Sequence, residues 1–189
     1  MSEALPLRRW TRREYDRLIE HGVFSTDEDI ELLRGLLVVR EPQGGRHAMA
    51  VRMVEEALRE VFRIGWDVRS QLPIALDPDS EPEPDLSVVA GSFRDYPAAH
   101  PTKPVLVVEV ADTSLALDRG EKVALYARAG VREYWIVDLV NGHLEVRRDP
   151  APEAEGGGRY ATGLVLSRTA TVTPLAAPHA AVAVADLVP

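Results

Sequence analysis

The segment 104–111 constrains the fold more than any other part of the chain, because it is almost entirely apolar and rich in valine. Its sequence, PVLVVEVA, lacks polar alternation, which is typical of a central strand buried on both faces. Glu109 interrupts this run. An unpaired carboxylate in such a strand is costly, so we expect Glu109 to be paired, metal-bound or protonated. A carboxylate satisfied by an arginine or by the backbone is the structural alternative.

The segments around this strand predict a mixed α/β fold. Apolar residues at helical spacing and capping signals predict helices over 11–21, 47–62 and 117–129. Strand-like runs occupy 31–40 (broken at Gly35), 66–76, 84–90 and 132–139, and short strands or irregular structure should follow. The unit 104–139 should form a right-handed crossover. We therefore predict a mixed β-sheet flanked by helices.

Length and composition favour a single globular domain. The 189 residues fit one domain with a core over roughly 30–140 and a β-rich C-terminal extension over 141–189. Cysteine is absent, which excludes disulfides, zinc–thiolate sites and a cysteine nucleophile. No signal peptide or membrane-spanning run is visible, so we expect a cytoplasmic protein. The net charge of -8 argues against a protein that coats DNA, but a metal site itself requires clustered carboxylates.

Two carboxylates on strands that are neighbours along the chain form a candidate metal site. Asp85 follows Pro84 at the beginning of one strand, and Glu109 lies in the next. Taken alone, Asp85 is more typical of a turn or cap. Together, two hard oxygen ligands on adjacent strands suit Mg²⁺ or Mn²⁺, which keep waters for a phosphate and a nucleophile.

Lys122 is a candidate catalytic residue because lysine is so scarce in this chain. Only Lys103 and Lys122 occur, and Lys122 follows Asp118 by four residues, on one helical face. A surface ion pair between these two residues is the alternative. A lysine near a metal can orient the attacking water and neutralise charge that builds on a phosphate.

Three further residues are weaker candidates. Glu31 is either an additional acid of the site or a surface glutamate at a strand edge. His47 lies at a helix start beside two glycines, where free backbone N–H groups favour a phosphate. Gln71 either forms hydrogen bonds within the site or faces solvent. The remaining histidines show no metal-ligand spacing, and we predict no role for them: His21, His100, His143 and His179.

Several spaced motifs carry a family resemblance. They are ELLRG from 31, QLPIAL from 71, EPDLSVV around 85, VLVVEVADTS around 109, DRGEK over 118–122 and YARAGVREYWIVDL over 126–139. In this order they resemble the Uma-type restriction endonuclease family of the PD-(D/E)XK nuclease superfamily. The resemblance implies a restriction-endonuclease-like mixed sheet, with Asp85 and Glu109 as metal ligands and Glu31 as an extra acid. The superfamily's usual lysine position is Ala111 here, so the resemblance implies that Lys122 replaces it from the following helix.

Two classes of function remain open. The first is a Mg²⁺-dependent DNA endonuclease with Asp85, Glu109, Lys122 and Glu31 in catalysis. His47, Gln71 and Asp118 would then contact substrate or support the catalytic residues. The second is a catalytically silent nuclease-like fold that binds nucleic acid or a protein; the net charge and Ala111 favour it. A hydrolase of another phosphoester is a third reading. A homodimer would suit cleavage of both DNA strands.

Overall fold

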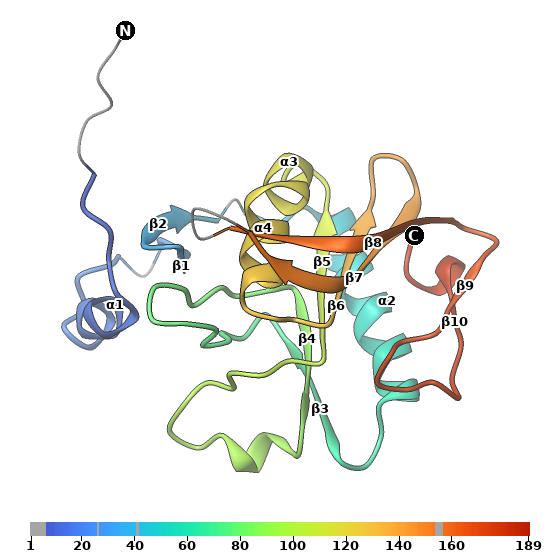
Figure 1. The fold of residues 1–189 in the computed structure, drawn as a ribbon, viewed down its shortest axis with the longest axis horizontal. Helices are drawn as coiled ribbons and strands as arrows, with labels where there is room; N and C mark the ends of the chain where they lie inside the picture. The colour runs from blue at the N-terminus through green and yellow to red at the C-terminus, as the bar shows by residue number, and fades with distance from the viewer. Residues whose placement is uncertain (1–6, 26, 41, 154–156) are drawn as a thin grey trace, which may run out of the picture.

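The computed structural model describes residues 7–25, 27–40, 42–153 and 157–189. Its centre is a six-stranded sheet in the order β3-β4-β5-β6-β7-β8 (Figure 1). The strands are β3 (Trp66–Ser70), β4 (Leu86–Ala90), β5 (Leu106–Ala111), β6 (Glu133–Asp138), β7 (His143–Pro152) and β8 (Gly158–Ser167). Neighbouring strands are antiparallel except β5 and β6, which are parallel. The predicted mixed sheet flanked by helices is therefore confirmed.

The connection between the parallel strands contains two short helices where the sequence predicted one. They are α3 (Leu115–Arg119) and α4 (Glu121–Arg128). Gly120 separates them with a non-helical ψ of -94°. A Cβ at Gly120 would lie only 3.0 Å from the carbonyl oxygen of Ala116. The glycine therefore allows the chain to change direction before α4 crosses the sheet.

Helices cover the two faces of the sheet. Helix α2 (Gly45–Val61) packs on one face together with the C-terminal segment, which contains β9 (Thr171–Val172), β10 (Val182–Ala183) and the 3-10 helix η3 (Val184–Asp186). Helix α4 packs on the other face (Figure 1).

The alternation of side chains in β5 places Glu109 on the α4 face. Val108 and Val110 belong to the core cluster under α2, whereas Val107 and Ala111 belong to the cluster under α4. Successive residues of a strand point to opposite faces, so Glu109 lies on the same side as Val107 and Ala111. The buried carboxylate therefore faces the helix that carries the candidate lysine.

The predicted strand 31–40 forms a separate hairpin beside α1 (Arg12–Glu20). Its strands are β1 (Ile30–Leu33) and β2 (Leu36–Val39), joined by Arg34 and Gly35. Both turn residues have positive φ, 49° and 77°, as a two-residue type I′ turn requires. The hairpin lies outside the six-stranded sheet, but a bridge between Leu32 and Glu81 joins it to the loop before β4.

Two predictions about the strands are wrong. The strand predicted over 66–76 ends at Ser70, because Gln71 takes a positive φ of 51°. The region after residue 157 contains the ten-residue strand β8, which pairs along its length with β7. Among the residues that the structure describes, no helix is long and apolar enough to cross a membrane.

Candidate active site

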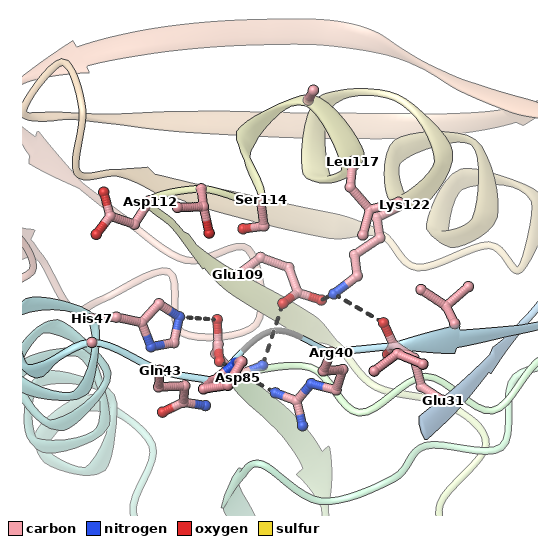
Figure 2. Close-up of a pocket in the computed structure, with 16 residues that line it drawn as sticks. Glu31, Arg40, Gln43, His47, Asp85, Glu109, Asp112, Ser114, Leu117 and Lys122 are labelled. Carbon is pink, nitrogen blue, oxygen red and sulfur yellow. Dashed lines mark hydrogen bonds and ion pairs between the residues drawn. The ribbon is translucent and has the colours of Figure 1, made fainter. Parts of the chain in front are cut away.

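A cavity of 570 Å³ lies between the β1–β2 hairpin, the beginning of α2 and the ends of β4 and β5 (Figure 2). Its walls contain all four residues that the sequence predicted as catalytic, together with His47 and Arg40. The charged residues that line it are Glu31, Arg40, His47, Asp85, Glu109, Asp112 and Lys122.

Asp85 and Glu109 face each other across the β4–β5 pair. The register pairs Leu86 with Val108, so Asp85 lies opposite Glu109 just before β4 begins. The two residues are buried, with exposed fractions of 4% and 2%. The N–H of Val110 donates to Asp85 Oδ2 at 2.8 Å, and Asp85 N lies 3.5 Å from Glu109 Oε2. The central strands therefore hold both carboxylates at a fixed separation.

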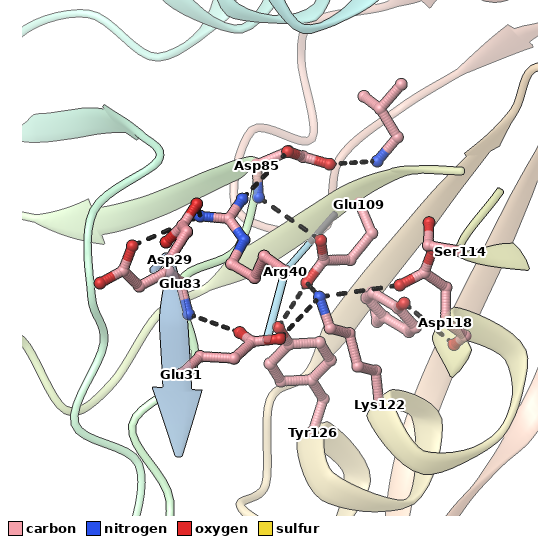
Figure 3. Close-up of polar contacts among 12 residues, drawn as sticks. Asp29, Glu31, Arg40, Glu83, Asp85, Glu109, Ser114, Asp118, Lys122 and Tyr126 are labelled. Carbon is pink, nitrogen blue, oxygen red and sulfur yellow. Dashed lines mark hydrogen bonds and ion pairs between the residues drawn. The ribbon is translucent and has the colours of Figure 1, made fainter. Parts of the chain in front are cut away.

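Lys122 reaches this pair from α4, on the same side of the sheet (Figure 3). Its Nζ lies 2.9 Å from Glu109 Oε1, 3.6 Å from Glu31 Oε1 and 3.7 Å from Asp118 Oδ1. Asp118 is itself held by the hydroxyl of Ser114, which donates to its Oδ2 at 2.6 Å. Three carboxylates from three chain segments thus surround one ammonium.

The pKa values in this cluster follow from burial and crowding. Burial raises the pKa of Glu109 to about 8, and neighbouring carboxylates reinforce the effect against the opposing charge of Lys122. Burial alone would lower the pKa of Lys122, but Glu109, Glu31 and Asp118 raise it above its usual value. Lys122 is therefore an ammonium at neutral pH. An additional cation beside Glu109 would lower the pKa of this carboxyl group and so favour the ionised form of Glu109.

His47 and Arg40 lie on the other side of Asp85. His47 Nε2 is 3.2 Å from Asp85 Oδ2, and Arg40 Nη2 is 3.8 Å from Asp85 Oδ1. Burial opposes the charge of His47, but the hydrogen bond to Asp85 and the charges of Asp85 and Glu109 together outweigh this and raise the histidine pKa. Burial also opposes ionisation of Asp85, but His47 and the N–H of Val110 lower its pKa overall. Asp85 is therefore ionised.

Two carboxylate oxygens in the cavity have room for another ligand. Among the described residues, Arg40 Nη2 lies 3.8 Å from Asp85 Oδ1, and Asp85 N lies 3.5 Å from Glu109 Oε2. Both distances are at or beyond the limit of a hydrogen bond. Two carboxylate oxygens with unused lone pairs suit a hard divalent cation. Asp85 and Glu109 therefore fit a magnesium or manganese ion.

Tyr126 and Arg40 also contact the two carboxylates, but the sequence did not predict either residue. The hydroxyl of buried Tyr126 donates to Glu109 Oε1 at 2.6 Å. Its signal was the four-residue spacing from Lys122, which places both side chains on one face of α4. Arg40 gave no such signal, because its partners come from separate segments of the chain.

Gln71 is not part of the same cavity. The structure places it in a second cavity of 410 Å³, whose acidic residues are Asp27, Asp29 and Glu83. The backbone N–H of Gln71 donates to the carbonyl of Asp85 at 3.0 Å. Its side chain therefore lies away from the cavity that Asp85 and Glu109 line.

A second acidic group, the hairpin group, lies at the β6–β7 turn and consists of Asp138, His143 and Glu145. One ligand atom from each lies within 4.8 Å of the others, a spacing that could hold a metal ion. Arg119 Nη2 lies 2.8 Å from Asp138 Oδ2 and also bonds Glu145 Oε1, so a guanidinium now neutralises the group. We predicted no role for His143, because hairpin pairing rather than local spacing brings it opposite Asp138.

The sheet order and the buried acid–lysine cluster define a nuclease-like α/β fold. A sequence profile of the Uma2 family, described as "Putative restriction endonuclease", matches residues 12–185, and the chain belongs to this family. The crystal structure of "a putative nuclease belonging to DUF820" from Anabaena variabilis aligns with 90% of this chain and 96% of that chain. Its TM-score is 0.68 at 18% sequence identity, which establishes a shared fold. No curated protein matches the chain.

Proposed function

We propose that this chain is a metal-dependent endonuclease that hydrolyses phosphodiester bonds in DNA. Asp85 and Glu109 would hold Mg²⁺ or Mn²⁺, and Lys122 and Glu31 would complete the catalytic set. The observation that carries this proposal is the Lys122 ammonium, 2.9 Å from Glu109 on the side of the sheet that Glu109 faces. Membership in a family described as "Putative restriction endonuclease" supports it.

The carboxylates are held in place before any ligand arrives. When bound, a divalent ion polarises the phosphate and lowers the pKa of its bound water. Asp85 is fixed by the N–H of Val110, and Glu109 by the hydroxyl of Tyr126. Such hydrogen bonds orient ligand oxygens and typically change metal affinity or activity by about 10- to 100-fold when removed.

Lys122 supplies a fixed positive charge from a nearly buried side chain. Glu109, Glu31 and Asp118 hold the side chain in place, and only 5% of the residue is exposed. From this position the ammonium would donate to the attacking water or to a phosphate oxygen and neutralise charge in the transition state. Glu31, fixed by the N–H of Glu83 at 3.0 Å, and Asp118 would position Lys122.

The beginning of α2 offers contacts for a neighbouring phosphate. Gly44 caps the helix without a side-chain hydrogen bond, and the first turn contains no acidic residue. Gly44 and His47 both line the cavity. Free backbone N–H groups and the positive end of the helix dipole favour an anion at such a terminus.

We propose further that residues 1–189 form a single nuclease domain that acts in the cytoplasm, with two copies associating when both strands are cut. The alternative function is a catalytically silent fold that binds nucleic acid or protein. The net charge of -8 and Ala111, at the superfamily's usual lysine position, favour this alternative.

Plasmid nicking in Mg²⁺ or Mn²⁺ tests the proposal. Wild type should nick supercoiled DNA, whereas Asp85→Ala and Lys122→Ala should not. Asp138→Asn, in the hairpin group, is the matched control and should retain activity. Equal nicking by all four proteins would indicate a contaminant. Absence of metal binding to wild type in calorimetry would favour the silent alternative.

A further inference from the structure

We propose that Arg40 supplies the positive charge beside Asp85 in the metal-free protein. Once a metal ion is bound there, Arg40 would bind the substrate's phosphodiester instead. The inference rests on the proposed function and deepens it, because it assigns a residue to phosphate recognition. Its basis is the position of Arg40 among acids of both cavities (Figure 3).

Arg40 follows β2 directly and places its guanidinium among three carboxylates. Nη1 lies 3.4 Å from Asp29 Oδ2 and 3.3 Å from Glu83 Oε2, and Nη2 lies 3.8 Å from Asp85 Oδ1. The side chain is only 15% exposed. These carboxylates keep the group charged and hold it in the interior.

The contacts of the guanidinium are unequal. Nη1 donates a hydrogen bond to Glu83, whereas the distance from Nη2 to Asp85 Oδ1 is too long for one. This same oxygen is the one that we assign to the metal. A divalent cation there would repel the guanidinium at short range, and the contact with Asp85 would be the one to break. Asp29 and Glu83 would retain the arginine near the site.

The position of Arg40 leaves it room to move. It lines the cavity of Asp85 and Glu109 and also the second cavity, which contains Asp29 and Glu83. The two other cations at the carboxylates have closer partners: Lys122 Nζ lies 2.9 Å from Glu109, and His47 Nε2 lies 3.2 Å from Asp85. The closest carboxylate to the Arg40 guanidinium among the described residues is Glu83, at 3.3 Å. Arg40 is therefore the cation best placed to receive a phosphate, whose geometry suits the guanidinium fork.

If Arg40 competes with the metal, its removal should change two affinities in opposite directions: that for Mn²⁺ should rise and that for DNA should fall. Arg40→Gln should bind Mn²⁺ about three- to tenfold more tightly, because removing a cation from beside Asp85 favours a second one. The same variant should bind a short labelled DNA oligonucleotide in Ca²⁺ about tenfold more weakly, because a charge-assisted phosphate contact is lost. An arginine with a purely structural role would not strengthen metal binding.

The experiment combines Mn²⁺ calorimetry with fluorescence anisotropy of the oligonucleotide in Ca²⁺. Arg52→Gln is the control, because it removes the same charge from an exposed position on α2. It should leave both affinities within about twofold of wild type, as expected for an exposed ion pair. Arg40→Lys keeps the charge but loses the fork, so it should bind Mn²⁺ like wild type and the oligonucleotide more weakly.

Each result has a defined meaning. Unchanged or weaker Mn²⁺ binding by Arg40→Gln, beside a wild type that binds Mn²⁺, overturns this inference and leaves the nuclease proposal intact. A wild type that binds no Mn²⁺ overturns both. Should Arg40→Gln fail to fold, as judged by circular dichroism, Arg40→Lys decides: oligonucleotide binding equal to wild type overturns the phosphate role.

Discussion

The central sheet carries two buried acidic groups that differ in how their charge is neutralised. In the hairpin group, Glu145 accepts hydrogen bonds from Arg119 and Arg147, and Asp138 accepts from Arg119. In the proposed active site, Asp85 Oδ1 lies 3.8 Å from the Arg40 guanidinium and Glu109 Oε2 lies 3.5 Å from the N–H nitrogen of Asp85, so both contacts are long.

The groups also differ in access. Asp85 and Glu109 line a cavity of 570 Å³, whereas the hairpin group lines neither of the two cavities described above. Exposure alone does not separate them, since Asp138 and Glu145 are as buried as Asp85 and Glu109. Buried carboxylates therefore indicate a ligand site only where oxygens remain unfilled and a ligand can reach them.

The largest expected effect is the loss of DNA nicking when a carboxylate of the proposed active site, rather than one of the hairpin group, is replaced. Asp85→Asn should reduce nicking about a thousandfold, because an amide is a poorer metal ligand and leaves the phosphate charge unbalanced. The substitution keeps the shape of the side chain and relieves its repulsion with Glu109, which offsets the lost contacts with His47 and Arg40, so the melting temperature should stay near that of wild type. Retention of more than about a tenth of the activity would contradict the assignment of Asp85 as a metal ligand.

The next effect should appear only in stability. Asp138→Asn removes a buried charge that Arg119 and Asn141 contact, and should lower the free energy of unfolding by about 2 kcal/mol in urea titrations. Nicking should stay within about twofold of wild type, since additivity holds for sites without shared partners. A metal-dependent loss of activity would instead place a functional ion in the hairpin group.

A smaller effect should follow when Glu109 loses the hydrogen bond that orients its carboxylate. Tyr126→Phe deletes the hydrogen bond to Glu109 and should weaken Mn²⁺ binding about tenfold. Tyr160→Phe is the matched control, because its hydroxyl donates to the carbonyl of Val131 at 2.8 Å instead. It should cost some stability but leave Mn²⁺ affinity unchanged. Equal Mn²⁺ affinities in the two variants would exclude a positioning role for Tyr126.

The smallest effect on the proposed active site concerns a buried carboxylate that belongs to neither group. Glu81 is 4% exposed, and its nearest cation is Arg12, at 3.6 Å. Burial, assisted by Asp16 and Glu83, raises its pKa to about 7 despite Arg12. The folded state then binds the proton more tightly than the unfolded state, so stability falls as pH rises from about 4.5 to 7.

Glu81→Gln should remove this slope. Urea unfolding at pH 8 should show a gain of up to about 3 kcal/mol over wild type, with little difference at pH 4.5, where Glu81 is protonated in the folded protein. Glu56→Gln, which removes an exposed carboxylate from α2, should show no such dependence on pH. A wild-type stability that does not fall between pH 5 and pH 8 relative to Glu81→Gln would show that Arg12 balances Glu81 fully.

Local patterns account for the parts of the fold that the sequence predicted. The apolar run at 104–111 indicated the buried strand, and the helical repeat after His47 indicated α2. Strand β8 was missed because its apolar residues Leu164, Val165 and Leu166 are consecutive and do not alternate with polar ones. Its pairing with β7 is a tertiary contact that local sequence patterns do not reveal. The division of α3 from α4 was missed because apolar residues continue on both sides of Gly120.

The candidate site could be predicted only where motifs carried it. Asp85, Glu109 and Lys122 were indicated by a buried acid, a scarce lysine and the family resemblance, and the structure places them around one cavity. The position of Gln71 depends on its positive φ of 51°, which no sequence pattern predicts. Arg40 depends on acids from two other segments, Asp29 before β1 and Glu83 and Asp85 before β4, so its position follows from the assembled fold alone.

Residues of the proposed site are dispersed along the chain, from Glu31 in the first hairpin to Lys122 in the crossover helix. The sheet that aligns them also needs β6, β7 and β8, which follow Lys122 in sequence. A ribosome would therefore release most of the polypeptide before carboxylates and ammonium could meet. During synthesis, the proposed active site would thus form only after β6, β7 and β8 have left the ribosome, so the nascent chain would lack the proposed activity.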